Sequence, residues 1–216
     1  MDKKFAIFDM DGTLVDSMPY WHSLGREFLR SKGVTGDVEA VLQQIKPMTM
    51  LESSELFIRE FGLEGSPESV SAEMNGMMDE HYRQDVQARP GVGAYLRRLR
   101  EKGVTMCVAS ATAAPLVESC LTRLGLAEDF TFLLSCDEVG AGKNRPDVFL
   151  EAARRLGAEP GETAVFEDAL FAAATAHEAG FYTVGIYDEN GKHHWERLQA
   201  VADECIPDWE TAAKQL

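Results

Sequence analysis

Phe5-Ala-Ile-Phe-Asp-Met-Asp-Gly-Thr-Leu-Val-Asp16 is the stretch that decides the fold of this 216-residue chain. An apolar run opens it and predicts a buried strand, which ends where Asp9 and Asp11 begin. Side chains at positions i and i+2 leave a strand on the same face, so we expect both carboxylates to point into one site. Gly12 follows them and would let backbone N–H groups approach a ligand closely.

Two carboxylates this close repel each other by roughly 4 kcal/mol at an effective dielectric near 20. Burying them without partners would cost several kcal/mol more. A bound divalent cation is the simplest remedy, and Mg²⁺ prefers oxygen ligands of this kind. The pattern therefore predicts a cation site at the end of the first strand.

Composition narrows the classes of partner. The formal net charge of −15 argues against nucleic acid, because binding a phosphate backbone requires a basic surface. The same charge disfavours docking on anionic membranes, and no apolar stretch of the sequence approaches the length of a membrane helix. Carboxylates interrupt the only early apolar run, so no signal peptide is expected. The four cysteines form no CxxC pair, which predicts reduced, buried thiols in a cytoplasmic protein.

Beyond residue 91, short apolar strands alternate with helices. We expect strands at residues 104–110, 130–135, 163–166, 182–186 and 204–206. We expect helices at residues 91–102, 113–124, 146–156, 169–179 and 209–216. Near-continuous apolar strands between helices indicate a parallel sheet covered on both faces. The sequence thus predicts an α/β, Rossmann-like core made of residues 1–16 and 87–216.

The intervening residues 17–86 show helical signals and no convincing strand. Helices are expected at residues 17–32, after the capping box that Thr49 forms with Glu52, and from Pro67 to about residue 85. We interpret this segment as a small helical cap domain inserted after the first strand. Its position in the chain suits a lid over the site.

Chemistry-bearing residues follow four of the expected strands. These segments are Asp9-Met-Asp-Gly-Thr13, Ser110-Ala-Thr112, Lys143 within residues 142–147, and Glu167-Asp168. Open α/β sheets bind ligands at the carboxyl ends of their strands. A carboxylate pair, a hydroxyl, an ammonium and a second acidic pair together suit phosphoryl transfer. Taken alone, Asp-Gly could be a hairpin turn, Lys143 a surface lysine and Asp168 the cap of the next helix.

In order and spacing these four motifs resemble those of the haloacid dehalogenase superfamily, whose members mostly hydrolyse phosphate esters. The helical insert resembles that family's small cap, and the resemblance covers essentially the whole chain. The β-phosphoglucomutase-like phosphatases are the subgroup it resembles most. The resemblance implies a phosphoric monoester hydrolase with Mg²⁺ as cofactor and a small phosphorylated metabolite as substrate. The sequence does not indicate an oligomeric state.

The resemblance also implies a role for each matched residue. Asp9 attacks phosphorus and becomes an aspartyl phosphate, while Asp11 protonates the leaving alkoxide and then deprotonates water. The implied Mg²⁺ ligands are the Asp9 carboxylate, the Asp11 main-chain carbonyl, Asp168 and, directly or at one remove, Glu167. The implied phosphate-binding groups are Ser110, Lys143 and backbone amides near Gly12 and Ala111.

Two other functions resemble parts of the pattern. A sugar-phosphate mutase must hold a second phosphate, yet the cap arginine of β-phosphoglucomutases falls on Met50 here, which leaves Lys46 as the nearby candidate. Residues 72–82 of the later cap helix contain no Lys or Arg. A phospho-receiver domain uses Asp, Ser or Thr, and Lys on a similar sheet, but lacks such an insert. Arg145 could reach the substrate or lie on the surface.

Overall fold

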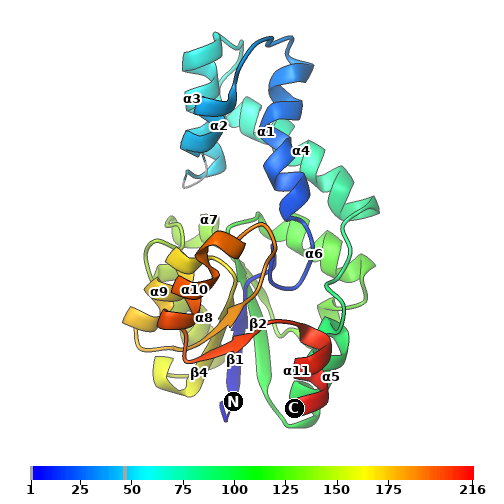
Figure 1. The fold of residues 1–216 in the computed structure, drawn as a ribbon, viewed down its shortest axis with the longest axis vertical. Coiled ribbons are helices and arrows are strands. Elements are labelled where there is room, and N and C mark those ends of the chain that lie inside the picture. Colours follow the sequence, from blue (N-terminus) through cyan, green and yellow to red (C-terminus); the bar gives the residue numbers. More distant parts are fainter. Residues whose placement is uncertain (1, 46–47) are drawn as a thin grey trace. The chain divides into compact units, whose positions relative to one another are not determined.

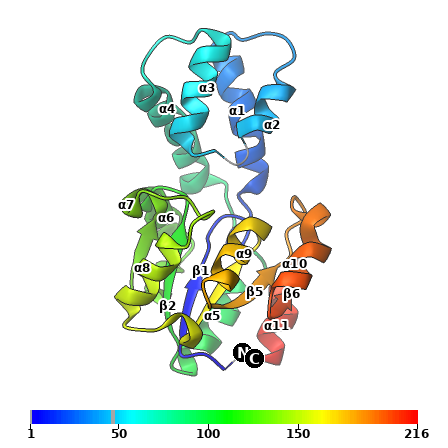
Figure 2. The ribbon, with the colours of Figure 1, turned by 90° about the vertical axis from the view of Figure 1, so that its left-hand side faces the viewer.

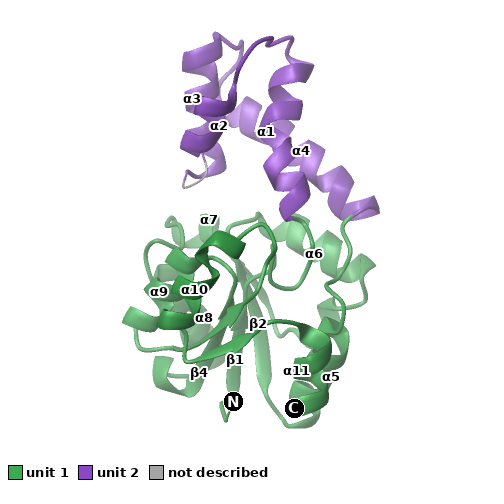
Figure 3. Cartoon of the chain, in the orientation of Figure 1, with its two compact units in different colours: residues 1–17, 86–216 green, residues 18–85 purple. Residues whose placement is uncertain are grey.

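The computed structural model describes residues 2–45 and 48–216 (Figure 1, Figure 2). The chain divides into two compact units, of which unit 1 comprises Met1–Ser17 and Val86–Leu216 and unit 2 comprises Met18–Asp85 (Figure 3). Lys46, the candidate for a second phosphate clamp, lies outside the described residues. Among the described residues, no helix combines the length and the apolar character that crossing a membrane requires.

Unit 1 is built on a six-stranded sheet with the order β3-β2-β1-β4-β5-β6, in which every pair of neighbours is parallel (Figure 1). The strands are β1 (Phe5–Phe8), β2 (Thr105–Ser110), β3 (Leu133–Ser135), β4 (Thr163–Glu167), β5 (Tyr182–Ile186) and β6 (Glu204–Ile206). The chain order reverses between β1 and β4, which is the switch point where such sheets bind ligands. The predicted α/β, Rossmann-like class is confirmed.

Helices cover both faces of this sheet (Figure 2). They are α5 (Val92–Glu101), α6 (Ala114–Arg123), α7 (Cys136–Val139), α8 (Asp147–Leu156), α9 (Leu170–Glu178), α10 (Trp195–Val201) and α11 (Trp209–Gln215). Alternation along β1 sends Ile7 into a core with Phe149 of α8. Phe8 points to the other face, where it stacks on Phe166 of β4 at 4.2 Å and lies near Trp209 of α11.

The described residues of unit 2 form the helices α1 (Met18–Ser31), α2 (Glu39–Ile45), α3 (Met50–Phe61) and α4 (Pro67–Gln84) with loops between them. The expected capping box starts α3, because the Thr49 side chain accepts from the Glu52 N–H and the Glu52 side chain accepts from the Thr49 N–H. Ser66 caps α4 with proline at its first position, also as expected.

Three short helices and one strand boundary differ from the sequence expectation. Helices α2, α7 and α10 were not expected; they are short and carry little periodic pattern, although α11 of seven residues was expected. The third strand covers residues 133–135 rather than 130–135, after a helical turn at Ala127–Asp129. All four cysteines are free and three are buried, as predicted.

Gly91 offers a test of how tightly α11 packs against the start of α5. Its φ is +91°, and an added Cβ would lie 2.6 Å from the carbonyl carbon of Trp209. We therefore expect Gly91→Ala to lower the free energy of unfolding by about 3 kcal/mol or more. Gly103→Ala is the matched control, because Gly103 has a φ of +78° with open space around it. It should cost about 1–2 kcal/mol, and equal losses in urea denaturation would contradict the close packing.

Candidate active site

Asp9 lies at the carboxyl end of β1, next to β4. Its N–H donates to the Phe166 carbonyl at 3.0 Å, which continues the parallel ladder by one residue. The Lys143 ammonium donates to Asp9 Oδ1 and also to Glu167 Oε1. All three side chains are buried. Asp9 lies 134 positions before Lys143 in the sequence and Glu167 lies 24 positions after it, yet both bond the same ammonium. The order of the motifs predicted this meeting.

Electrostatics at this point are unbalanced. Burial raises the pKa of Asp9 well above its ordinary value, Lys143 opposes the shift, and the Glu167 charge adds to it. Burial likewise raises the pKa of Glu167 against the opposing charge of Lys143. Burial alone would lower the pKa of Lys143, but Asp9 and Glu167 outweigh it and raise that pKa. The single ammonium of Lys143 therefore does not balance the charge of the carboxylates around it.

Asp168 lies against the turn that follows β1. Thr13 Oγ1 donates to Asp168 Oδ1 at 3.0 Å, and a Cβ on Gly12 would stand 2.5 Å from Asp168 Oδ2. Only glycine leaves room for this carboxylate. Burial is the main cause that raises the pKa of Asp168 to about 8, with the Glu167 charge second and the Thr13 hydrogen bond opposing. Asp168 bonds Thr13 rather than capping α9, which begins without a side-chain cap.

A cation fits this arrangement. Asp9, Glu167 and Asp168 each offer a carboxylate oxygen, and these oxygens lie within 4.8 Å of one another. Three carboxylates face one ammonium, which leaves a formal excess of two negative charges. Hard oxygen donors and a deficit of two positive charges match what Mg²⁺ takes in proteins. The close approach that Gly12 permits brings Asp168 into this set.

Asp11 has different partners from Asp9. Its Oδ1 accepts from the Ser17 hydroxyl at 2.6 Å and its Oδ2 accepts from the Thr112 hydroxyl at 2.7 Å. Its side chain lies outside the three-carboxylate cluster, and the family resemblance assigns the Asp11 main-chain carbonyl, not the side chain, to a metal. The Thr112 N–H donates to Ser110 Oγ at 3.0 Å, which leaves the buried Ser110 hydroxyl its own proton to donate.

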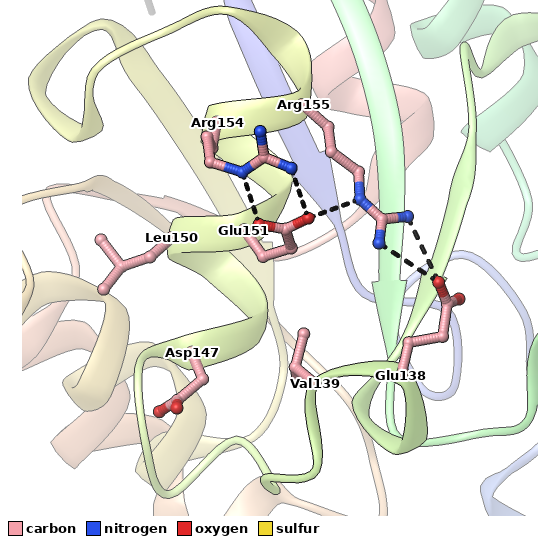
Figure 4. A pocket seen from close by; sticks show the side chains of 7 residues that line it. All are labelled: Glu138, Val139, Asp147, Leu150, Glu151, Arg154 and Arg155. Atoms are coloured by element: carbon pink, nitrogen blue, oxygen red, sulfur yellow. Dashed lines mark hydrogen bonds and ion pairs between the residues drawn. The ribbon is translucent and has the colours of Figure 1, made fainter.

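The remaining candidates lie nearer the surface. Ala111 is exposed at the end of β2. Arg145 is exposed and pairs with Asp147 at 2.8 Å. Its side chain thus lies on the surface, which is one of the two placements that the sequence left open. Figure 4 shows a surface pocket beside α8, where Arg155 pairs with Glu151 and Glu138. None of the described residues that line this pocket bonds Asp9.

Sequence reasoning missed residues that hold the site from outside. Ser17, the first residue of the helix expected at residues 17–32, donates to Asp11, and so does Thr112, which ends the segment after the second expected strand. Arg89, whose guanidinium donates to the Gly12 carbonyl, was not singled out. Their positions were a usable signal for the first two, because Thr112 ends one chemistry-bearing segment and Ser17 directly follows the opening stretch. No local pattern marks Arg89, because its partners are 77 and 98 residues away.

Known proteins share both the sequence pattern and the fold. A family model described as haloacid dehalogenase-like hydrolase matches residues 3–180. Fructose-1-phosphate phosphatase YqaB of Escherichia coli (strain K12) is 28% identical over 181 residues, which cover 83% of this chain and 94% of that protein. The β-phosphoglucomutase of Bacillus subtilis (strain 168) is 28% identical over 199 residues, which cover 85% and 83%. The crystal structure of CbbY from Rhodobacter sphaeroides in complex with phosphate matches with a TM-score of 0.82 at 22% identity, over 99% of this chain and 100% of that one.

The raised pKa of Asp168 predicts a pH dependence of stability. The ordinary pKa is 3.8 and the folded value is about 8, so between these values the folded protein holds a proton that the unfolded chain releases. Metal-free protein should therefore lose stability as pH rises from about 5 to 8. Asp168→Asn should reduce this dependence of stability on pH, whereas Asp16→Asn, at an exposed position, should not. Melting temperatures across this range test the sign, and stability that rises with pH would contradict it.

Proposed function

Because the chain belongs to the haloacid dehalogenase-like hydrolases, as its motifs predicted, we propose that it is a Mg²⁺-dependent phosphatase that hydrolyses a small organic phosphate monoester. The observation that carries the proposal is the junction of Asp9, Lys143 and Glu167 at the sheet's switch point, with Asp168 beside it. The similarity to relatives named as a phosphatase and a mutase of sugar phosphates supports a small phosphorylated metabolite as substrate.

In the first proposed step, an Asp9 carboxylate oxygen forms a bond to phosphorus while the ester P–O bond breaks. The leaving alkoxide takes a proton from the Asp11 carboxyl group. In the second step, the Asp11 carboxylate takes a proton from water, whose oxygen attacks phosphorus and releases inorganic phosphate and the Asp9 carboxylate. The aspartyl phosphate thus splits one displacement into two.

The surrounding groups supply charge and orientation. Lys143 holds the Asp9 carboxylate in place and offers its positive charge to the phosphoryl oxygens. The Ser110 hydroxyl and the backbone amides near Gly12 and Ala111 would donate to the same oxygens. Asp9, Asp168, Glu167 and the Asp11 main-chain carbonyl would hold Mg²⁺. The bound ion would neutralise these carboxylates and the phosphate dianion.

We further propose that unit 2 is a cap that excludes bulk water and selects the leaving group. The sequence predicts residues 17–86 as the boundaries of this cap. The absence of Lys and Arg from residues 72–82 supports a phosphatase over a mutase, because a mutase needs a second phosphate clamp. A phospho-receiver role is disfavoured, since receiver domains lack a helical insert of this kind.

Asp9→Asn tests the nucleophile. We expect phosphate release from p-nitrophenyl phosphate to fall by about a thousandfold or more. The melting temperature should change little, because Asn has nearly the shape of Asp and its side-chain oxygen can still accept from Lys143. Asp16→Asn, at an exposed position of the same segment, should keep full activity. Chelation should stop the wild-type enzyme and added Mg²⁺ restore it; appreciable turnover by Asp9→Asn or by metal-free protein would refute the mechanism.

A second assay separates the phosphatase from the mutase and the receiver. Purified protein with Mg²⁺ and β-glucose 1-phosphate is followed by ³¹P NMR. We expect inorganic phosphate to accumulate over many turnovers, with formation of glucose 6-phosphate slower than release. Faster interconversion of the two sugar phosphates would establish the mutase. A single turnover that leaves the protein phosphorylated would establish the receiver.

A further inference from the structure

The chain that returns from unit 2 lies along the turn that carries Gly12. Within unit 1, the Asp16 N–H donates to the Gln87 carbonyl at 2.9 Å, and the Arg89 N–H donates to the Leu14 carbonyl at 2.9 Å. These two bonds pair residues 86–89 with the end of the turn in antiparallel fashion. The pairing fixes the backbone of Arg89 beside the candidate active site.

The Arg89 guanidinium joins this turn to the loop that follows β5. Nη1 donates to the Gly12 carbonyl, and Nη2 donates to the Tyr187 carbonyl. Nη1 also lies 3.4 Å from Asp188 Oδ2. The Arg89 side chain is 16% exposed and that of Asp188 only 6%, so the pair is largely withdrawn from water. The planar guanidinium holds its N–H donors in fixed directions, so it can bond acceptors on two separate loops at once. A lysine ammonium could not reproduce this geometry.

Gly12 is the point at which this bridge meets the acidic cluster. The Gly12 carbonyl belongs to the planar peptide that leads into Thr13. Thr13 Oγ1 donates to Asp168, and Gly12 itself leaves room for the Asp168 carboxylate. Rotation of this peptide would move both the hydroxyl donor and the space beside Asp168. Holding the carbonyl therefore fixes the surroundings of one proposed Mg²⁺ ligand.

We propose that Arg89 is a positioning residue for the cation site: by bonding the Gly12 carbonyl it holds the turn against Asp168. The inference rests on the proposed function, because it takes Asp168 as a ligand of Mg²⁺. It adds a residue from outside the four motifs. It also gives Asp188 a role, which is to balance the charge of Arg89 at Nη1, the nitrogen that donates to the Gly12 carbonyl.

A purely electrostatic role for Arg89 would have the opposite sign. A positive charge near a cation site opposes binding of the cation, so removing the guanidinium would strengthen Mg²⁺ binding if charge were its only effect. Loss of positioning weakens Mg²⁺ binding instead, because Asp168 is no longer held in place. Changes to groups that orient metal ligands typically weaken metal binding by about 10- to 100-fold. The direction of the change thus separates the two roles.

The test is calorimetric titration of Mg²⁺ into the full-length protein without substrate. We expect Arg89→Ala and Arg89→Lys each to weaken binding by about tenfold or more. Guanidinium ion added to the Arg89→Ala protein should restore part of the affinity, and methylammonium should not. The matched control is Arg155→Ala, which removes the surface ion pairs to Glu151 and Glu138 drawn in Figure 4 and should leave Mg²⁺ affinity unchanged.

Unchanged or tighter Mg²⁺ binding by Arg89→Ala, or full affinity in Arg89→Lys, would overturn the inference. Should the alanine variant not fold, the lysine variant carries the same comparison. Because no substrate is present in the titration, wild-type protein that binds Mg²⁺ but releases no phosphate from p-nitrophenyl phosphate would refute the proposed function and leave the Arg89 result valid. Wild-type protein that does not bind Mg²⁺ would refute both.

Discussion

The ion contact of Lys143 with Asp9 and Glu167 is the constraint on which the site depends. Parallel pairing of β1 with β4 aligns Phe8 with Phe166, so the next residue on each strand is a carboxylate, and the two face one ammonium. Buried charges of this kind are costly even when paired. Apolar packing in the core offsets that cost. Phe8, Phe166 and Trp209 pack together next to the site. The site is held in an arrangement that its own electrostatics oppose.

The sequence was sufficient for the parts of the site that lie at strand ends. Apolar runs stop visibly at Asp9, Ser110 and Glu167, and a parallel sheet must bring such ends to one edge. The residues that hold the turn from outside could not be predicted, because their partners are remote and their types are common. The Trp209 indole donates to the Thr13 carbonyl at 3.0 Å across 196 residues, and nothing in the sequence around either residue marks that bond. Helix α10 was missed for a different reason, since seven residues give barely two turns of pattern, although α11 of the same length was expected.

The turn after β1 is fixed by main-chain acceptors as well as by its carboxylates. Its Gly12 and Thr13 carbonyls accept from Arg89 and from Trp209, which come from segments at opposite ends of unit 1's longer part. Glycine makes the first of these contacts compatible with Asp168, because any side chain would fill the space that the carboxylate uses. Rigid support of this kind suits the proposed function, since a turn that moved would carry its proposed phosphate donors out of position.

Asp9 and Asp11 leave the same strand two residues apart, yet their partners suit different chemistry. Asp9 faces an ammonium, which donates only, and an accepting carboxylate is what its proposed role as nucleophile requires. Asp11 faces the hydroxyls of Ser17 and Thr112, each of which can donate to a carboxylate or accept from a carboxylic acid. Both oxygens of Asp11 therefore have a hydrogen-bond partner that can donate or accept. In the proposed mechanism Asp11 gives a proton in one step and takes one in the next, and partners of this kind suit that role.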